Sequence, residues 1–341
     1  MDPTAQRPIG RSGLKVTRFG FGTAPLGGFR DVVPEADAID TIVAAYDGGV
    51  RLFDSSPYYG YGRAELRLGA ALRDKPRENF VLSTKIGRWM TPIPPGTSVA
   101  GWRGGGLPFA PTFDYSYDGV HKSLEQSMLR LGMSRIDIVF IHDVDFWTVR
   151  DHALLEQRFR QAMDGAYKAL DELRRAGTIG AIGVGLNEAD MSARFVRAGE
   201  FDCVLLAGRY TLLEQGALTD FLPLCVQRGV SVVIGGPFNS GILATGARAG
   251  ARYDYGEAPA KVLDRVRRIE AVCTRHAVPL PAAALQFPLG HPAVATVIPG
   301  AMSRAEVTGN LELFRRPIPA ALWAELRHEG LLDAAAPLPG A

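Results

Sequence analysis

The chain has 341 residues, of which 47% are hydrophobic and 22% charged, and its formal net charge is +2. This composition supplies a sizeable core and excludes a disordered chain, while a balanced charge without concentrated basic patches gives no support for a nucleic-acid or membrane partner. The opening MDPTAQRPIG lacks the features of a signal peptide, so we expect a cytoplasmic protein. Three cysteines lack metal-ligand spacing and are expected to be buried free thiols: Cys203, Cys225 and Cys273.

Short apolar runs alternate with amphipathic runs along the whole chain. The first segment, 7–20, predicts a β-hairpin that turns at Ser12 and Gly13. Helical periodicity predicts helices over 34–49, over 118–133 with Asp118 as the N-cap, over 159–179 and over 258–278. Eight β-rich segments complete the pattern: 19–23, 50–56, 79–87, 136–145, 179–186, 202–210, 230–238 and 294–300.

Eight apolar strands alternating with helices predict the α/β class and a closed parallel (β/α)8 TIM barrel, with residues 1–341 forming a single domain. Two long segments interrupt the alternation, Arg88–Tyr117 after strand three and Asp145–Arg160 after strand four. Long loops are usually functional, and loops at strand ends lie on the face of a barrel where active sites are built. We therefore expect the functional site at this face.

Four chemically active side chains follow three consecutive strands. Asp54 ends strand two and Tyr59 follows it, Lys85 ends strand three, and His142 ends strand four. Each has an ordinary structural interpretation alone: a turn cap, loop packing, a surface lysine and a structural histidine. Together they suit proton transfer at a hydroxyl or carbonyl, because an ammonium held by a carboxylate favours the phenolate form of a nearby tyrosine. No zinc signature, nucleophile elbow or paired-carboxylate motif competes, and no metal is expected.

Five stretches make the chain resemble the aldo-keto reductases: GFGTAPLGG (20–28), LFDSSPYYGYGRAELRLG (52–69), LSTKIG (82–87), DIVFIHD (137–143) and GTIGAIGVG (177–185). The resemblance covers nearly the whole chain and implies a catalytic tetrad of Asp54, Tyr59, Lys85 and His142. Two further stretches, GVGLNEAD (183–190) and PFNSGILA (237–244), are similar to the NAD-linked sugar dehydrogenases of that family.

The resemblance also implies a nicotinamide cofactor bound beyond strands seven and eight, and the Rossmann G-x-G-x-x-G fingerprint is absent from the chain. The implied cofactor-binding residues are Gly22, Thr23, Asp54, Asn187, Pro237, Phe238, Asn239, Ser240, Gly241, Leu243, Pro299, Gly300, Glu306 and Asn310. The expected substrate contacts are Tyr59, Trp89, His142 and Trp147.

The chain departs from the family pattern at several of these positions. Gly185 and Leu186 stand where a Ser-Asn pair usually grips the carboxamide, so Asn187 is the expected replacement; Ala207 stands for the usual Gln, and Gly235 for the stacking Tyr. Where NADP-preferring members carry a Lys and an Arg, this chain has Gly300 and Glu306. We therefore expect NAD as the cofactor.

The resemblance implies a small-molecule substrate and an oxidoreductase that oxidises a cyclic aldose, such as L-fucose, D-arabinose or L-galactose, at C1 to the lactone. Pyridoxal, which also forms a ring hemiacetal, is the alternative substrate. A cofactor-sensing binding protein without significant turnover is a third interpretation, and tight cofactor binding with absent turnover would favour it.

Overall fold

The structure is a computed structural model that describes residues 1–29, 31–97, 99, 101–102 and 104–340. Its centre is a sheet of eight strands in which all neighbouring strands are parallel. In sheet order these are β14 (Val294–Ile298), β11 (Ser231–Gly235), β10 (Cys203–Ala207), β9 (Ala181–Leu186), β8 (Ile138–His142), β5 (Val81–Ile86), β4 (Leu52–Asp54) and β3 (Phe21–Gly22).

Isolated parallel bridges join the two edges of this sheet. Phe19 pairs with Val297 and Gly22 with Gly300, and the Gly20 amide donates to the Val297 carbonyl at 2.9 Å. These bridges close the sheet into a barrel, because each edge strand finds its backbone partner in the other. The predicted (β/α)8 barrel is confirmed.

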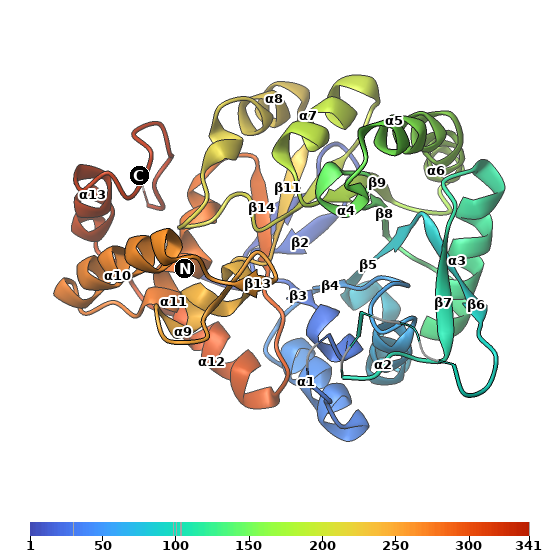
Figure 1. The fold of residues 1–341 in the computed structure, drawn as a ribbon, viewed down its shortest axis with the longest axis horizontal. Coiled ribbons are helices and arrows are strands. Elements are labelled where there is room, and N and C mark those ends of the chain that lie inside the picture. Colours follow the sequence, from blue (N-terminus) through green and yellow to red (C-terminus); the bar gives the residue numbers. More distant parts are fainter. Residues whose placement is uncertain (30, 98, 100, 103, 341) are drawn as a thin grey trace.

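Helices follow the strands and surround the barrel (Figure 1). They are α1 (Glu35–Asp47), α2 (Arg63–Leu72), α3 (Tyr117–Leu131), α4 (Phe146–Val149), α5 (His152–Gln161), α6 (Tyr167–Arg175), α7 (Ala189–Ala198), α8 (Phe221–Arg228), α9 (Ile242–Thr245), α10 (Ala260–Arg275), α11 (Leu280–Gln286), α12 (Arg304–Arg315) and α13 (Ala320–His328). Shorter turns are η1 (Ala24–Gly27), η2 (Arg77–Asn79), η3 (Ala162–Ala166), η4 (Gly216–Leu218), η5 (Asn239–Gly241) and η6 (Phe287–Gly290).

Two apolar layers hold the barrel together. A large cluster lies between the sheet and the helices, and a smaller one fills the barrel interior. Gly183 makes room inside, since a Cβ there would lie 2.8 Å from the Phe140 ring. The predicted N-terminal hairpin, β1 (Gln6–Pro8) and β2 (Lys15–Thr17), is antiparallel and adds the fully buried Ile9 and Val16 to the interior cluster. The hairpin therefore plugs one end of the barrel.

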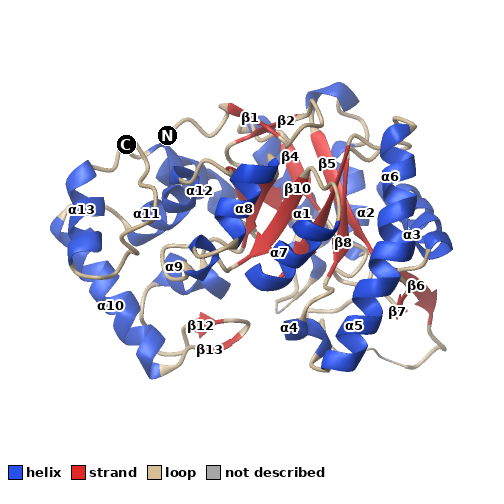
Figure 2. Ribbon diagram, turned by 90° about the horizontal axis from the view of Figure 1, so that it is seen from above, coloured by secondary structure: helices blue, strands red, loops and turns tan. Residues whose placement is uncertain are grey.

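The segments that interrupt the alternation gather at the opposite end (Figure 2). Both were expected to be loops, and both contain regular structure. The segment after β5 contains the antiparallel hairpin β6 (Arg88–Pro92) and β7 (Phe109–Phe113); its residues 98, 100 and 103 lie outside the described residues. The segment after β8 contains α4 and most of α5, because the side chains of Asp145 and Asp151 cap them by accepting from Thr148 N and Leu154 N.

A third addition at this end is the short hairpin β12 (Arg252–Tyr253) and β13 (Gly256–Glu257), which follows β11 and α9. The prediction of Asp118 as the N-cap of α3 is wrong, because the helix begins earlier and Ser116 Oγ accepts from Gly119 N at 3.1 Å. The three cysteines are buried and free, as expected. Among the described residues, no helix is both long and apolar enough to cross a membrane.

Candidate active site

A buried ion pair stands where β4 and β5 end. Lys85 Nζ lies 2.7 Å from Asp54 Oδ2 and also donates to the Ser55 carbonyl at 2.7 Å. Ser83 Oγ donates to the other carboxylate oxygen of Asp54, again at 2.7 Å. Adjacent parallel strands bring their carboxyl ends to one edge of the sheet. These two residues therefore meet although they are 31 positions apart in the chain. Both carboxylate oxygens are thus occupied, which fixes the Lys85 ammonium.

Tyr59 and His142 complete the four-residue cluster that the sequence predicts. Lys85 Nζ lies 4.8 Å from the centroid of the Tyr59 ring. The Tyr59 and His142 rings meet edge to face, with centroids 6.2 Å apart. Tyr59 comes from the turn after β4 and His142 from the last position of β8. The structure therefore brings all four predicted residues to the same end of the barrel.

The surroundings move the pKa values of three of these groups. Burial raises the pKa of Asp54, against the opposing influence of Lys85. The pKa of His142 is well below its ordinary value, because burial disfavours the imidazolium and Arg88 and Lys85 repel it. Burial raises the pKa of Tyr59 well above its ordinary value, and the carboxylates of Asp54 and Asp143 add to the effect.

The direction for Tyr59 corrects a sequence-based expectation. An ammonium beside the phenol was expected to favour the phenolate, but two of the three N–H groups of Lys85 are engaged by Asp54 and Ser55, and burial is the largest influence on the pKa of Tyr59. The phenol is therefore the resting form of Tyr59 at neutral pH, which makes it a proton donor until a base or a cation shifts the balance.

Sequence reasoning missed two charged residues of the cluster, Arg88 and Asp143. Arg88 is 3% exposed and pairs with Asp143 at 2.7 Å. Its other terminal nitrogen, Nη1, lies 3.0 Å from His142 Nδ1. A signal for both was present, because Arg88 directly follows strand three and Asp143 directly follows His142.

Asn187 is anchored at the end of β9 by two carboxylates. Its side-chain nitrogen lies 3.2 Å from Asp143 Oδ1 and 3.1 Å from Asp145 Oδ2, and its backbone N–H donates to Asp145 at 2.6 Å. The nitrogen is thus engaged within the protein, and the amide oxygen is the atom that a carboxamide N–H can approach. This fits the predicted contact between Asn187 and a nicotinamide.

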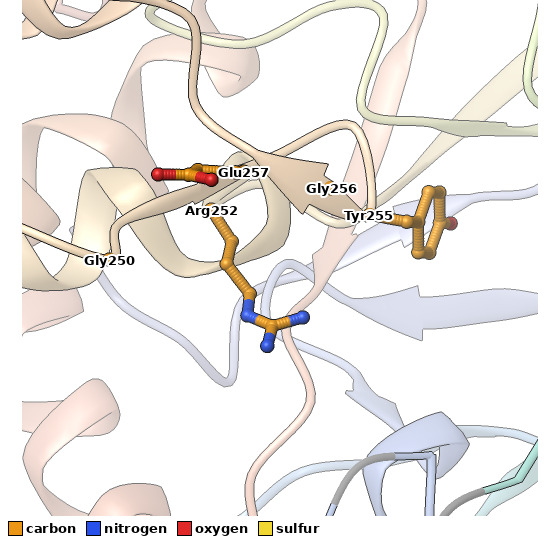
Figure 3. Close-up of a pocket in the computed structure, with 5 residues that line it drawn as sticks. All are labelled: Gly250, Arg252, Tyr255, Gly256 and Glu257. Carbon is orange, nitrogen blue, oxygen red and sulfur yellow. The ribbon is translucent and has the colours of Figure 1, made fainter.

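The tip of the β12–β13 hairpin lies over the same end of the barrel. Asp254 accepts from Arg209 Nη2 at 2.7 Å and from Trp147 Nε1 at 3.2 Å. The Tyr255 ring stacks at a tilt on the Trp147 ring, with centroids 5.0 Å apart. The hairpin also borders an open cavity of about 490 Å³, lined by Gly250, Arg252, Tyr255, Gly256 and Glu257 (Figure 3). Of the two predicted aromatic substrate contacts, Trp147 therefore stands at the barrel mouth.

The other predicted aromatic contact, Trp89, does not lie beside the four-residue cluster. Neighbouring residues of a strand face opposite sides, so Arg88 turns towards His142 and Trp89 turns away. The Trp89 indole donates to Asp114 at 3.3 Å, and Lys122 Nζ lies 3.2 Å from its ring centroid. Trp102, 7% exposed, packs beside Tyr59 instead, with ring centroids 6.0 Å apart.

Two of the predicted cofactor contacts have other partners in the structure. Thr23 Oγ1 donates to the Asp54 carbonyl at 2.9 Å, so it positions the end of β4. Asn239 accepts from Thr211 and donates to the Gly208 carbonyl, which ties the turn after β11 to the end of β10. Both side chains keep some capacity, since Thr23 Oγ1 can still accept and Asn239 Nδ2 has a second N–H, so these two cofactor contacts stay predictions.

Gly22 ends β3, and the other remaining predicted cofactor contacts lie on the segments after β11 and β14. Ser240 has a positive φ of 62° and accepts from Tyr255 N, which leaves its hydroxyl hydrogen for another acceptor. Glu306 is exposed in the first turn of α12, and its carboxylate accepts from Met302 N at 2.7 Å. Near these two residues in the chain lie Pro237, Phe238, Gly241, Leu243, Pro299, Gly300 and Asn310.

The backbone of β9 comes close to Lys85 and His142 at Gly185. A Cβ added to Gly185 would lie 3.6 Å from Lys85 Cε and 3.8 Å from His142 Cδ2, which is ordinary contact distance. The glycine therefore leaves a gap of about one atom's depth between the two side chains and the backbone of β9.

Comparison with known proteins bears on this arrangement. The model of the Aldo/keto reductase family matches residues 18–328. The chain belongs to the aldo/keto reductase family. It is therefore an oxidoreductase, and the resemblance stated from the sequence motifs is confirmed.

This aldo/keto reductase is similar to several characterised proteins. It is 44% identical to the pyridoxal 4-dehydrogenase of Microbacterium luteolum, over 96% of this chain and 98% of the relative. It is 38% identical to a D-threo-aldose 1-dehydrogenase from a Pseudomonas species, over 94% and 96%. The L-galactose dehydrogenase of Arabidopsis thaliana is 28% identical, over 89% and 86%.

Solved structures agree on the fold. An aldo-keto reductase from Bacillus halodurans, in its holo form, superposes with a TM-score of 0.73 at 23% identity and covers 97% of each chain. A glycerol dehydrogenase from Gluconobacter oxydans gives 0.72 at 22% identity, over 100% of this chain and 98% of that one. At these identities the likeness supports the barrel alone.

Proposed function

We propose that this aldo/keto reductase oxidises a ring hemiacetal at its anomeric carbon to the lactone, with NAD as the cofactor. The observation that carries the proposal is the convergence of Asp54, Tyr59, Lys85 and His142 at one barrel mouth. When bound, NAD supplies the hydride acceptor.

Tyr59 is the proposed acid–base residue. In the oxidation its phenolate oxygen takes the proton of the anomeric hydroxyl, while the hydrogen on the anomeric carbon leaves with its bonding electrons, so that a carbonyl forms. His142 binds the same substrate oxygen and orients it. Asp54 and Lys85 hold the site in shape, and Lys85 supplies a fixed positive charge 4.8 Å from the Tyr59 ring.

The charges at the barrel mouth favour an uncharged substrate. Lys85 pairs with Asp54, Arg88 with Asp143, and Arg209 with Asp254. His142 is held neutral by its lowered pKa. A phosphate held beside the four-residue cluster would need to break one of these pairs to find a cation, so we expect pyridoxal 5′-phosphate and sugar phosphates to be poor substrates.

A cyclic aldose is the first candidate substrate, since relatives 38% and 28% identical are named for D-threo-aldose and L-galactose. Pyridoxal is the second, and the relative 44% identical is named for it. Both present an uncharged ring hemiacetal, so the same four residues serve either.

Preference for NAD rests on the segment after β14. A Cβ at Gly300 would lie 2.5 Å from Pro25 Cγ, so no lysine fits there without displacing η1. Arg304, a cation near the same place, is paired with Asp40 at 2.8 Å. The 2′-phosphate of NADP carries about −1.5 to −2 charges and needs such cations.

An initial-rate screen tests both parts. NAD and NADP are each combined with L-fucose, D-arabinose, L-galactose and pyridoxal, and the lactone is identified by mass spectrometry. We expect NAD-linked turnover of one of these hemiacetals, and a kcat/KM ratio for the two cofactors that moves towards NADP in Glu306→Arg. A wild-type preference for NADP would contradict the cofactor assignment. Tight cofactor binding without turnover of any substrate would favour a cofactor-sensing protein.

A further inference from the structure

The contacts of the two His142 ring nitrogens determine which of them carries the proton. Two side chains approach Nδ1: Arg88 Nη1 at 3.0 Å and Ser56 Oγ at 3.3 Å. An arginine has no acceptor atom, so the contact with Arg88 exists only if Nδ1 carries no proton. Ser56 is compatible with the same state, because its oxygen already accepts from Tyr58 N at 3.2 Å and its hydrogen is left to donate.

The opposite ring nitrogen has the opposite environment. Nε2 of His142 lies 3.3 Å from Asp143 Oδ1, a carboxylate oxygen that only accepts while ionised. The proton of a neutral imidazole therefore sits on Nε2. This contact lacks the geometry of a hydrogen bond, so the Nε2 proton is not committed to Asp143 and can be donated to a substrate oxygen that comes closer.

The side chain of Arg88 is fixed more firmly than the imidazole of His142. Its Nη2 donates to Asp143 Oδ2 at 2.7 Å, and its guanidinium lies 4.4 Å from the Tyr58 ring centroid and 4.5 Å from that of Phe113. Its carbonyl accepts from Ser123 Oγ at 2.9 Å, which ties the start of β6 to α3. A cation so restrained imposes its geometry on the imidazole rather than following it.

We propose that Arg88 is a positioning residue that locks His142 in the neutral Nε2–H tautomer, so that the histidine donates one hydrogen bond to the substrate oxygen and does not titrate during the reaction. The proposal rests on the proposed function only for the identity of that oxygen. Four titratable or charged groups face the ring: Arg88, Asp143, Lys85 and Tyr59. Proton transfer is then left to Tyr59.

The test is nuclear magnetic resonance of protein carrying 15N-labelled histidine, recorded from pH 5 to 9 without substrate. The six histidines are distinguished by comparison with His142→Gln. For the wild type we expect shifts of an Nε2–H tautomer that stay constant over this range. In Arg88→Met, Nδ1 loses its fixed donor and the repelling cation is removed, so His142 should show mixed tautomers and titrate within the range.

Kinetics supply the second measurement. Arg88→Met should lower kcat/KM about 10- to 100-fold, as expected for loss of a hydrogen bond to a charged group. It should also introduce an acidic limb that the wild type lacks. Arg88→Lys keeps the positive charge but loses the two terminal guanidinium nitrogens that contact His142 and Asp143. Its kcat/KM should lie between those of the wild type and Arg88→Met, and it replaces the Met variant if that variant folds poorly. Ser56→Ala is the matched control, since Arg88 alone should preserve the tautomer.

A wild-type His142 that carries its proton on Nδ1, or that titrates near pH 6.5, would overturn the proposal. So would unchanged tautomer and pH behaviour in both Arg88 variants. If the resonances behave as expected and no hemiacetal is oxidised, the positioning role stands and the proposed function fails, because the resonance measurement uses no substrate.

Discussion

Tyr59 has the Lys85 ammonium over its ring, and burial together with the carboxylates of Asp54 and Asp143 sets the direction of its pKa. If it is the acid–base residue, Tyr59→Phe removes the only proton that the phenol can exchange. Turnover should then fall by about 10²–10⁴-fold while the cofactor still binds. Single-turnover rates and fluorescence titration with NAD measure the two quantities. Near-wild-type turnover in this variant would refute the assignment.

Asp143 provides a way to shift that pKa without touching Tyr59. Its negative charge raises the pKa of the phenol, and Arg88 lowers it. Asp143→Asn removes the negative charge and leaves the positive charge of Arg88 without its ion-pair partner. Both changes lower the pKa of Tyr59. Because oxidation requires the phenolate, the rising limb of kcat/KM against pH should move to lower pH.

Asp151→Asn is the control for this substitution, since Asp151 caps α5 on the same segment after β8. Its profile should match the wild type in position. An Asp143→Asn profile that also stays in place would show that the limb does not belong to Tyr59.

At the scale of elements, the β12–β13 hairpin is held in an unusual conformation. Its two turn residues, Asp254 and Tyr255, have φ of 48° and 65°, as a type I′ turn requires, although neither is glycine. For non-glycine residues this costs of order 1–3 kcal/mol each. The contacts of Asp254 with Arg209 and Trp147 offset that cost at the barrel mouth.

Asp254→Ala should therefore release the hairpin tip without unfolding the barrel. We expect faster backbone hydrogen exchange and faster tryptic cleavage at Arg252, together with a higher KM for the substrate. Glu257→Ala, an exposed position on β13, is the control and should leave cleavage unchanged. Equal cleavage of the Asp254 variant and the wild type would show that these contacts do not hold the tip.

Periodicity and strand-end chemistry predicted the barrel and the meeting of Asp54, Tyr59, Lys85 and His142, because both depend on local pattern and on the common direction of parallel strands. Strand-end position pointed to Arg88, but its contact with His142 and the orientation of Trp89 could not be predicted in this way. They depend on a hairpin whose strands are joined by a long connection, and on which face of β6 turns inwards. The pKa direction of Tyr59 depends on burial and on a distant carboxylate, neither of which a single strand end displays.

At the scale of the whole molecule, the Asp54–Lys85 pair is part of the stability of the barrel as well as of its site. Both side chains are almost fully buried, at 3% and 1% exposure. Removing one partner of such a pair leaves an uncompensated charge and costs about 3–5 kcal/mol. We expect this loss in the free energy of unfolding of Lys85→Met at pH 7, measured by denaturant titration.

Acidification should reduce the deficit. Without Lys85 the pKa of Asp54 in the folded state rises further, so the native state binds a proton more readily than the unfolded chain, and stability is recovered as the pH falls through that range. The double variant Asp54→Asn/Lys85→Met should be more stable than Lys85→Met at pH 7. A single variant as stable as the wild type would mean that the pair contributes nothing to folding.

The β1–β2 hairpin closes one end of the barrel with Ile9 and Val16, and this limits the directions from which ligands can reach the site. Because this hairpin closes one end and the apolar cluster fills the interior, ligands approach the four-residue cluster from the opposite end, where α4 and the β12–β13 hairpin lie (Figure 2). Ligands of Tyr59 bind and dissociate through this end of the barrel. If the cofactor and the substrate both come from this end, the one that lies closer to the barrel must bind first and be released last.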